Sequence, residues 1–175
     1  MKHYFKATIF VAVCLSIISC APKKKSRVPY VDYASEVISE DETINVPYTV
    51  ENGVKYVSVK VNGLSTDMVF DTGCSMTLIS ILEAEQLAKR GLLVNDDFLG
   101  TTTASIADGS IVEDAVFNIR TLELTDGTQT IVCRNVPTQV SSNIGAPVLL
   151  GNGVLDRVAS YTIDNEQRVI KFKLK

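Results

Sequence analysis

The chain has 175 residues, of which 46% are hydrophobic and 21% charged, a balance typical of a folded domain and unlike that of a disordered chain. Its formal net charge of −3 is small, which argues against nucleic acid as a partner. The single histidine, His3, lies close to the N-terminus. The remaining sequence therefore lacks the histidine of a Ser-His-Asp or Cys-His catalytic site and of the usual zinc site, and we expect neither a metal nor a cofactor.

Residues 1–19 are typical of a secretory leader. Basic residues at the start precede an apolar run from Ala7 to Ile18, which is shorter than a comfortable membrane span. The run ends in Ile17-Ile18-Ser19-Cys20, which resembles the bacterial lipobox, a motif whose cysteine is acylated and becomes the new N-terminus. We therefore expect a lipoprotein signal peptide, lipidation at Cys20, and a domain held outside the cytoplasm on a membrane of the bacterial cell envelope. The alternative is a plain signal peptide with an incidental cysteine.

Residues 20–43 are predicted to be a flexible tether, because they are polar, lack hydrophobic periodicity and change from basic to acidic. Four cations follow Cys20 closely: Lys23, Lys24, Lys25 and Arg27. Near anionic headgroups each such charge contributes about 1 kcal/mol to membrane binding. A segment that is simply solvated would have the same composition, so the sequence leaves open whether these cations bind a membrane surface or only contact water. The folded domain is expected to span residues 44–175.

From residue 44 onward, short apolar runs separated by turn residues predict a domain built mainly of β-strands. Residues 54–61 alternate apolar and polar side chains with a period of two, as a half-buried strand does. Asn62-Gly63 then signals a hairpin turn, and Met68-Val69-Phe70 leads into the next strand.

One substantial helix is predicted near residues 81–90, since Ser80 and Glu83 fit a capping box and Gly91 suits the C-terminal cap. Further hairpin turns are predicted at Asp108-Gly109, at Asp126-Gly127 and at Asn165.

The segment from Met68 to Ile79 carries the clearest chemical signal. An apolar strand delivers Asp71 into a turn formed by Thr72 and Gly73, and further apolar residues lead the chain away. The tripeptide Asp-Thr-Gly is weak evidence by itself, because turns closed by an Asp side chain are common. The flanking apolar runs would bury this turn, however, and a carboxylate is rarely held in such a place without a partner or a catalytic role.

This segment resembles the active-site loop of the retropepsin-like (clan AA) aspartic proteases, in which an apolar pair precedes Asp-Thr/Ser-Gly. Leu149-Leu150-Gly151 is similar to the apolar-apolar-Gly segment that crosses behind the loop in that fold. Ile106 to Ser110 falls where the family has its flap hairpin. The resemblance covers about residues 44–175, and it implies a mainly β, single-lobe retropepsin-like acid-protease barrel with one substantial α-helix.

The resemblance also implies a function, namely that of an aspartic endopeptidase that hydrolyses polypeptides through a water activated between two carboxylates. Asp71, Thr72 and Gly73 would form the catalytic loop, and substrate would contact Cys74, Ser75, Ala107, Asp108 and Gly109. The chain contains no second Asp-Thr/Ser-Gly, so the other carboxylate must come from a second copy in a two-fold homodimer. In the family the Thr of each loop makes hydrogen bonds across that axis.

Cys74 departs from the family pattern, which commonly has Ala or Ser three positions after the Asp. Once residues 1–20 are set aside, Cys74 and Cys133 are the remaining cysteines, and the sequence leaves open whether they form a disulfide. A non-catalytic, lipid-anchored peptide-binding module on the same fold is the alternative function. A structural lipoprotein would account for the leader and the tether but not for the loop.

Overall fold

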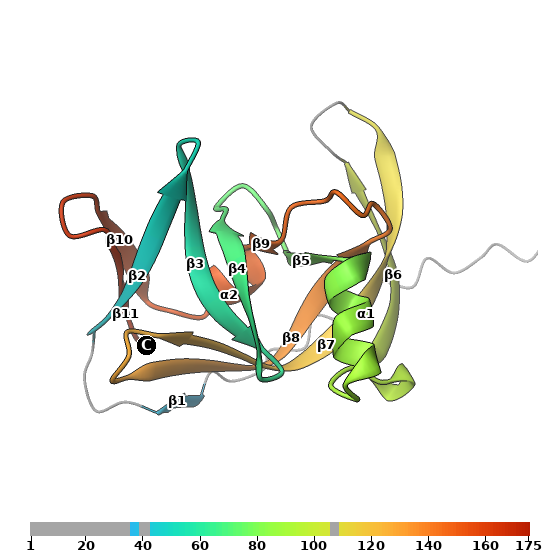
Figure 1. Cartoon of the computed structure of the whole chain (residues 1–175), viewed down its shortest axis with the longest axis horizontal. Helices are drawn as coiled ribbons and strands as arrows, with labels where there is room; N and C mark the ends of the chain where they lie inside the picture. The colour runs from blue at the N-terminus through green and yellow to red at the C-terminus, as the bar shows by residue number, and fades with distance from the viewer. Residues whose placement is uncertain (1–35, 39–42, 106–108) are drawn as a thin grey trace, which may run out of the picture.

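The folded domain consists mainly of β-strands in the computed structural model, which describes residues 36–38, 43–105 and 109–175 (Figure 1). The predicted leader, Cys20 and most of the predicted tether lie outside the described residues, as do Ala107 and Asp108. In chain order the elements are β1 (Glu36–Ile38), β2 (Thr43–Glu51), β3 (Val54–Val61), β4 (Leu64–Phe70), β5 (Thr77–Ser80), α1 (Ile81–Lys89), η1 (Asn95–Asp97), β6 (Phe98–Ser105), β7 (Ile111–Thr125), β8 (Thr130–Ser141), β9 (Leu149–Leu150), α2 (Asn152–Leu155), β10 (Ser160–Asp164) and β11 (Val169–Lys173). The predicted mainly β architecture with one substantial helix is confirmed.

The strands belong to one sheet in which neighbours follow the order β10-β11-β2-β3-β4-β9-β5-β8-β7-β6. An additional pairing of β3 with β7 folds this sheet back on itself, and β1 adds to β8. Most neighbours are antiparallel, but β4 runs parallel to β9 and β5 runs parallel to β8. These two parallel pairs bring segments that are far apart in the sequence to one place in the fold.

The core follows from the alternation seen in the sequence. Alternate side chains of β2 and β3 point inward and are buried, whereas most of the side chains between them are partly or fully exposed. The buried ones are Ile44, Val46, Tyr48, Val57, Val59 and Val61. Fully burying one such aliphatic side chain stabilises the fold by about 1.5–3 kcal/mol relative to leaving it in water. The predicted strand at residues 54–61 is confirmed.

Helix α1 begins and ends where the sequence predicts. The Ser80 hydroxyl accepts a hydrogen bond from the Leu82 N–H, and the Glu83 carboxylate accepts one from the Ser80 N–H, both at 3.1 Å, so the capping box is present. At the other end Gly91 adopts φ +69°, a conformation that glycine reaches without a steric penalty. The Leu92 N–H then donates to the Leu87 carbonyl at 2.9 Å, as in a Schellman cap.

The hairpin turns predicted at Asn62-Gly63, Asp126-Gly127 and Asn165 lie between the strands β3/β4, β7/β8 and β10/β11, whereas the turn predicted at Asp108-Gly109 falls partly outside the described residues. Asn62 and Gly63 have φ values of 48° and 86°, as a two-residue turn between twisted strands requires. Asp126 closes the turn between β7 and β8 by accepting hydrogen bonds from the N–H groups of Thr128 and Gln129, both at 2.7 Å. No helix in the described part of the chain is long and apolar enough to cross a membrane.

Candidate active site

Strand β9 holds the start of the loop that carries Asp71. The loop spans residues 71–76 between β4 and β5, and Figure 1 shows it beside β9. The Val69 N–H donates to the Val148 carbonyl at 2.8 Å, and the Asp71 N–H donates to the Leu150 carbonyl at 3.2 Å. These bonds extend the parallel register of β4 and β9 up to the carboxylate-bearing residue, so the position of Asp71 is set by a segment about 80 residues away.

Asn152 holds the far side of the same loop. Its N–H donates to the Cys74 carbonyl at 2.8 Å, and its side-chain amide donates to the Thr72 carbonyl at 3.0 Å. Asn152 is a residue of the site that was not predicted from the sequence. The available signal was its position directly after Leu149-Leu150-Gly151, the segment expected to cross behind the loop.

Gly151 allows this close approach of two backbones. A Cβ atom added at Gly151 would lie 2.2 Å from the Met76 carbonyl oxygen and 2.8 Å from that of Cys74. Both distances are shorter than any real carbon contact, and both neighbours are backbone atoms that cannot move aside independently. A glycine is therefore required here for β9 and the loop to pack together.

The Asp71 carboxylate lies at the start of an exposed turn. Its Oδ1 atom accepts a hydrogen bond from the Gly73 N–H at 2.8 Å, and the Cys74 N–H donates to the Asp71 carbonyl at 3.4 Å. A Cβ on Gly73 would come within 3.2 Å of that Oδ1, so glycine leaves the carboxylate room. Asp71 is half-buried, whereas Thr72, Gly73 and Ser75 are exposed. The prediction that the flanking apolar runs bury this turn is wrong, because the buried side chains of those runs lie within β4 and β5. The loop between these strands presents one carboxylate and a polar tip at the surface.

Both described cysteines are free thiols, so Cys74 and Cys133 do not form a disulfide. Cys74 is half-buried in the loop, and its thiol donates to the Met76 carbonyl at 2.8 Å. Burial raises the pKa of Cys74, and the negative charge of Asp71 raises it further. Cys133 lies in the core on β8, where burial raises its pKa to about 11. The two residues differ in place and surroundings, and Cys74 alone belongs to the loop.

The β6–β7 hairpin projects beyond the rest of the sheet at the same end of the molecule as the Asp71 loop (Figure 1). Its last paired residues are Ser105 and Ile111, so the predicted hairpin over residues 106–110 is confirmed in its stem. Gly109 is exposed with φ +84°, whereas the tip residues Ala107 and Asp108 lie outside the described part. Among the described residues, no group of three or more His, Cys, Asp and Glu side chains could hold a metal ion.

Comparisons with known proteins identify one matching family and a solved structure with a similar fold. The sequence model of a family described as "gag-polyprotein putative aspartyl protease" matches residues 57–157, a range that contains both the Asp71 loop and Gly151. No curated protein matches the chain. The crystal structure of a retropepsin-like aspartic protease from Rickettsia conorii has a similar fold, with a TM-score of 0.51 and 17% sequence identity over 75% of this chain and 90% of that chain. This similarity confirms the predicted retropepsin-like fold.

Proposed function

The chain belongs to the gag-polyprotein aspartyl protease family, and on this basis we propose that it is an aspartic endopeptidase that acts as a homodimer. In this proposal the Asp71 carboxylates of two copies lie together and activate one water molecule between them. The observation that carries the proposal is the position of Asp71, which β9 holds at the start of a loop whose tip is exposed. An exposed tip is what a second copy needs in order to pack its own loop against this one.

The chemistry follows from two carboxylates at close range. They cannot both be ionised without strong repulsion, so one keeps a proton while the other is ionised. The ionised group takes a proton from water as the water oxygen attacks the peptide carbonyl, and the protonated group donates to the carbonyl oxygen. Collapse of the tetrahedral intermediate breaks the C–N bond, and the amine leaves with a proton supplied by the dyad. The Gly73 N–H, which donates to Asp71 Oδ1, fixes the orientation of the carboxylate.

The substrate would be an extended polypeptide lying between the Asp71 loop and the β6–β7 hairpin. In this arrangement Cys74 and Ser75 approach it from the loop, and Ala107, Asp108 and Gly109 from the hairpin. We expect a preference for apolar substrate residues. Two exposed apolar side chains support it, one on the β6–β7 hairpin and one on the segment that leads into β9, the strand that contacts the Asp71 loop. Ile111, in the last pair before the hairpin tip, is 76% exposed, and Ile144 in the segment before β9 is 66% exposed.

Activity is expected to depend on dimer formation, since each chain supplies one carboxylate. Specific activity should fall on dilution, in parallel with the dimer fraction measured by sedimentation. Thr72→Ala removes the hydroxyl expected to bond across the axis, where each buried hydrogen bond is worth about 1 kcal/mol, so the dimer dissociation constant should rise about tenfold or more. Ser75→Ala, a change at an exposed polar residue of the same loop, is the matched control and should shift the constant much less. A monomer with full turnover would contradict the homodimer proposal.

We further propose that the protein is anchored to a membrane of the bacterial cell envelope through lipid on Cys20. Mass spectrometry of the mature protein should then find no residues 1–19 and should find an acylated N-terminal cysteine. Cys20→Ala should move the protein from the membrane fraction to the soluble fraction, because the acyl chains provide most of the apolar burial in the bilayer. Cys14→Ala, which changes a cysteine inside the predicted leader, should leave the fractionation unchanged. Equal membrane partitioning of Cys20→Ala and the parent would exclude this anchor.

A further inference from the structure

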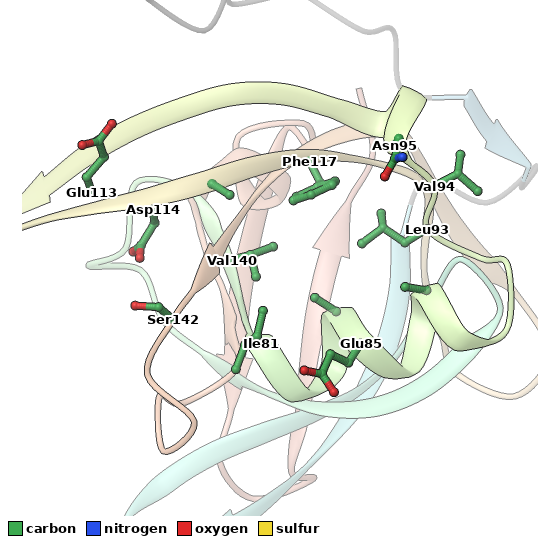
Figure 2. Close-up of a pocket in the computed structure, with 13 residues that line it drawn as sticks. Ile81, Glu85, Leu93, Val94, Asn95, Glu113, Asp114, Phe117, Val140 and Ser142 are labelled. Atoms are coloured by element: carbon green, nitrogen blue, oxygen red, sulfur yellow. The ribbon is translucent and has the colours of Figure 1, made fainter.

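A cavity of about 440 Å³ lies between helix α1 and the base of the β6–β7 hairpin (Figure 2), and no residue of the Asp71 loop lines it. Its walls are mainly apolar and come from elements distant in sequence: Ala84 on α1, Leu93 after it, Phe117 on β7 and Val140 on β8. Figure 2 shows Asp114 and Ser142 at one end of the cavity and Val94 and Asn95 at the other. The cavity is therefore an elongated apolar site with a carboxylate at one end.

The charged groups that line this cavity in the described part of the chain are all acidic. They are Glu85, Glu113 and Asp114. Glu85 forms an exposed ion pair with Lys89 at 3.2 Å, which is of little energetic consequence. Glu113 is exposed and accepts a hydrogen bond from the Thr101 hydroxyl at 2.9 Å.

Asp114 is the informative carboxylate, because it is 6% exposed and has no ion-pair partner among the described residues. The Gln139 side-chain amide donates to its Oδ2 atom at 2.7 Å, which offsets only part of the cost of burying the group. A cationic group entering the cavity would complete the interactions of this carboxylate. The site therefore suits a ligand that joins a positive charge to an apolar body.

One segment of the same chain has this composition. Lys23, Lys24, Lys25 and Arg27 are followed directly by Val28-Pro29-Tyr30-Val31, so cations and apolar side chains adjoin. We propose that residues 23–31 bind in the cavity, with their cations toward the acidic groups and their apolar side chains against its walls. This inference does not depend on whether the protein is a protease.

The register of β1 gives the direction and the distance that docking of residues 23–31 requires. Strand β1 is antiparallel to β8 with Glu36 opposite Val132 and Ile38 opposite Thr130, so the N-terminal end of β1 is the end nearer to Val140 on β8. From Val132 to Val140 the strand rises about 27 Å at 3.4 Å per residue. An extended chain from Glu36 back to Arg27 spans about 30 Å, and four further residues bring Lys23 within reach. Length, direction and charge thus agree.

A zero-length carbodiimide, which joins amines only to carboxylates in contact, tests the proposal on the purified full-length chain in uncharged detergent. Peptide mapping should find the lysines at 23–25 linked mainly to Glu113, which is exposed and not already ion-paired. The Lys89–Glu85 pair should also be linked in every sample, and it serves as the internal standard of the reaction. In a mixture of isotopically light and heavy chains, the links from residues 23–25 should join segments of one isotope only.

Three variants complete the experiment. Glu113→Gln should reduce the links from residues 23–25 to this part of the surface at least fivefold, whereas Glu166→Gln, at an exposed turn between β10 and β11, should leave them unchanged. Asp114→Asn keeps the shape of the buried group and should weaken the docking, seen as fewer links to Glu113 relative to the internal standard. Links spread evenly over distant carboxylates such as Glu51 and Glu166, or links that join light to heavy chains, would overturn the proposal.

Discussion

Asp71→Asn is expected to abolish peptide hydrolysis while leaving the fold and the dimer intact. An amide cannot act as a general base, and loss of that role alone lowers the rate by a factor of about 10²–10⁴. The amide matches the carboxylate in shape, and its oxygen can still accept the hydrogen bond from the Gly73 N–H. The structural cost should therefore be small. The dimer is expected to be at least as stable as in the parent, because two facing carboxylates no longer repel each other.

The measurement compares parent and variant on one peptide library, with cleavage products identified by mass spectrometry and the fold checked by circular dichroism. Asp67→Asn, an exposed aspartate on β4 just before the loop, is the matched control and should retain parental activity. The parent should show a bell-shaped pH profile, since the dyad works with one proton bound. Retained cleavage by Asp71→Asn, with contaminating proteases excluded, would instead favour the non-catalytic peptide-binding module.

Gly151→Ala is expected to have the largest effect on stability of any single methyl addition near the site. The new Cβ would lie 2.2 Å from the Met76 carbonyl oxygen, so β9 and the Asp71 loop would have to separate. Separation would break the hydrogen bond of the Asn152 N–H to the Cys74 carbonyl and would displace Asp71 from Leu150. We expect a loss of about 3 kcal/mol or more in the free energy of unfolding, or about 10 °C in Tm, together with loss of activity.

Gly153→Ala provides a matched control two residues away. A Cβ there would meet the Thr77 backbone nitrogen at 3.7 Å, an ordinary van der Waals contact. The position lies inside the short helix α2, where alanine is favoured over glycine, so stability should be unchanged or slightly higher. Thermal unfolding of the two variants side by side checks the prediction. Equal Tm values would contradict the packing argument for Gly151.

Much of the fold could be predicted because its signals are local in the sequence. The alternation of residues 54–61, the capping box of Ser80 with Glu83 and the turn residues Asn62-Gly63 each specify a backbone shape within a few residues. The structure confirms all three. Asp71 was likewise identified from its neighbours in the chain, because an apolar strand followed by Thr-Gly is visible without any knowledge of the tertiary structure.

The supports of the site depend on contacts between residues far apart in the sequence, and only the tertiary structure decided them. The resemblance placed Leu149-Leu150-Gly151 behind the loop, but the two hydrogen bonds from Asn152 and the absence of space at Gly151 arise from a backbone crossing that no local pattern encodes. The same holds for the free thiols of Cys74 and Cys133, whose state depends on where the Asp71 loop and strand β8 lie. The cavity beside Asp114 forms only when α1 packs near β7 and β8. Local periodicity determines which elements form, whereas the packing of those elements determines which side chains meet.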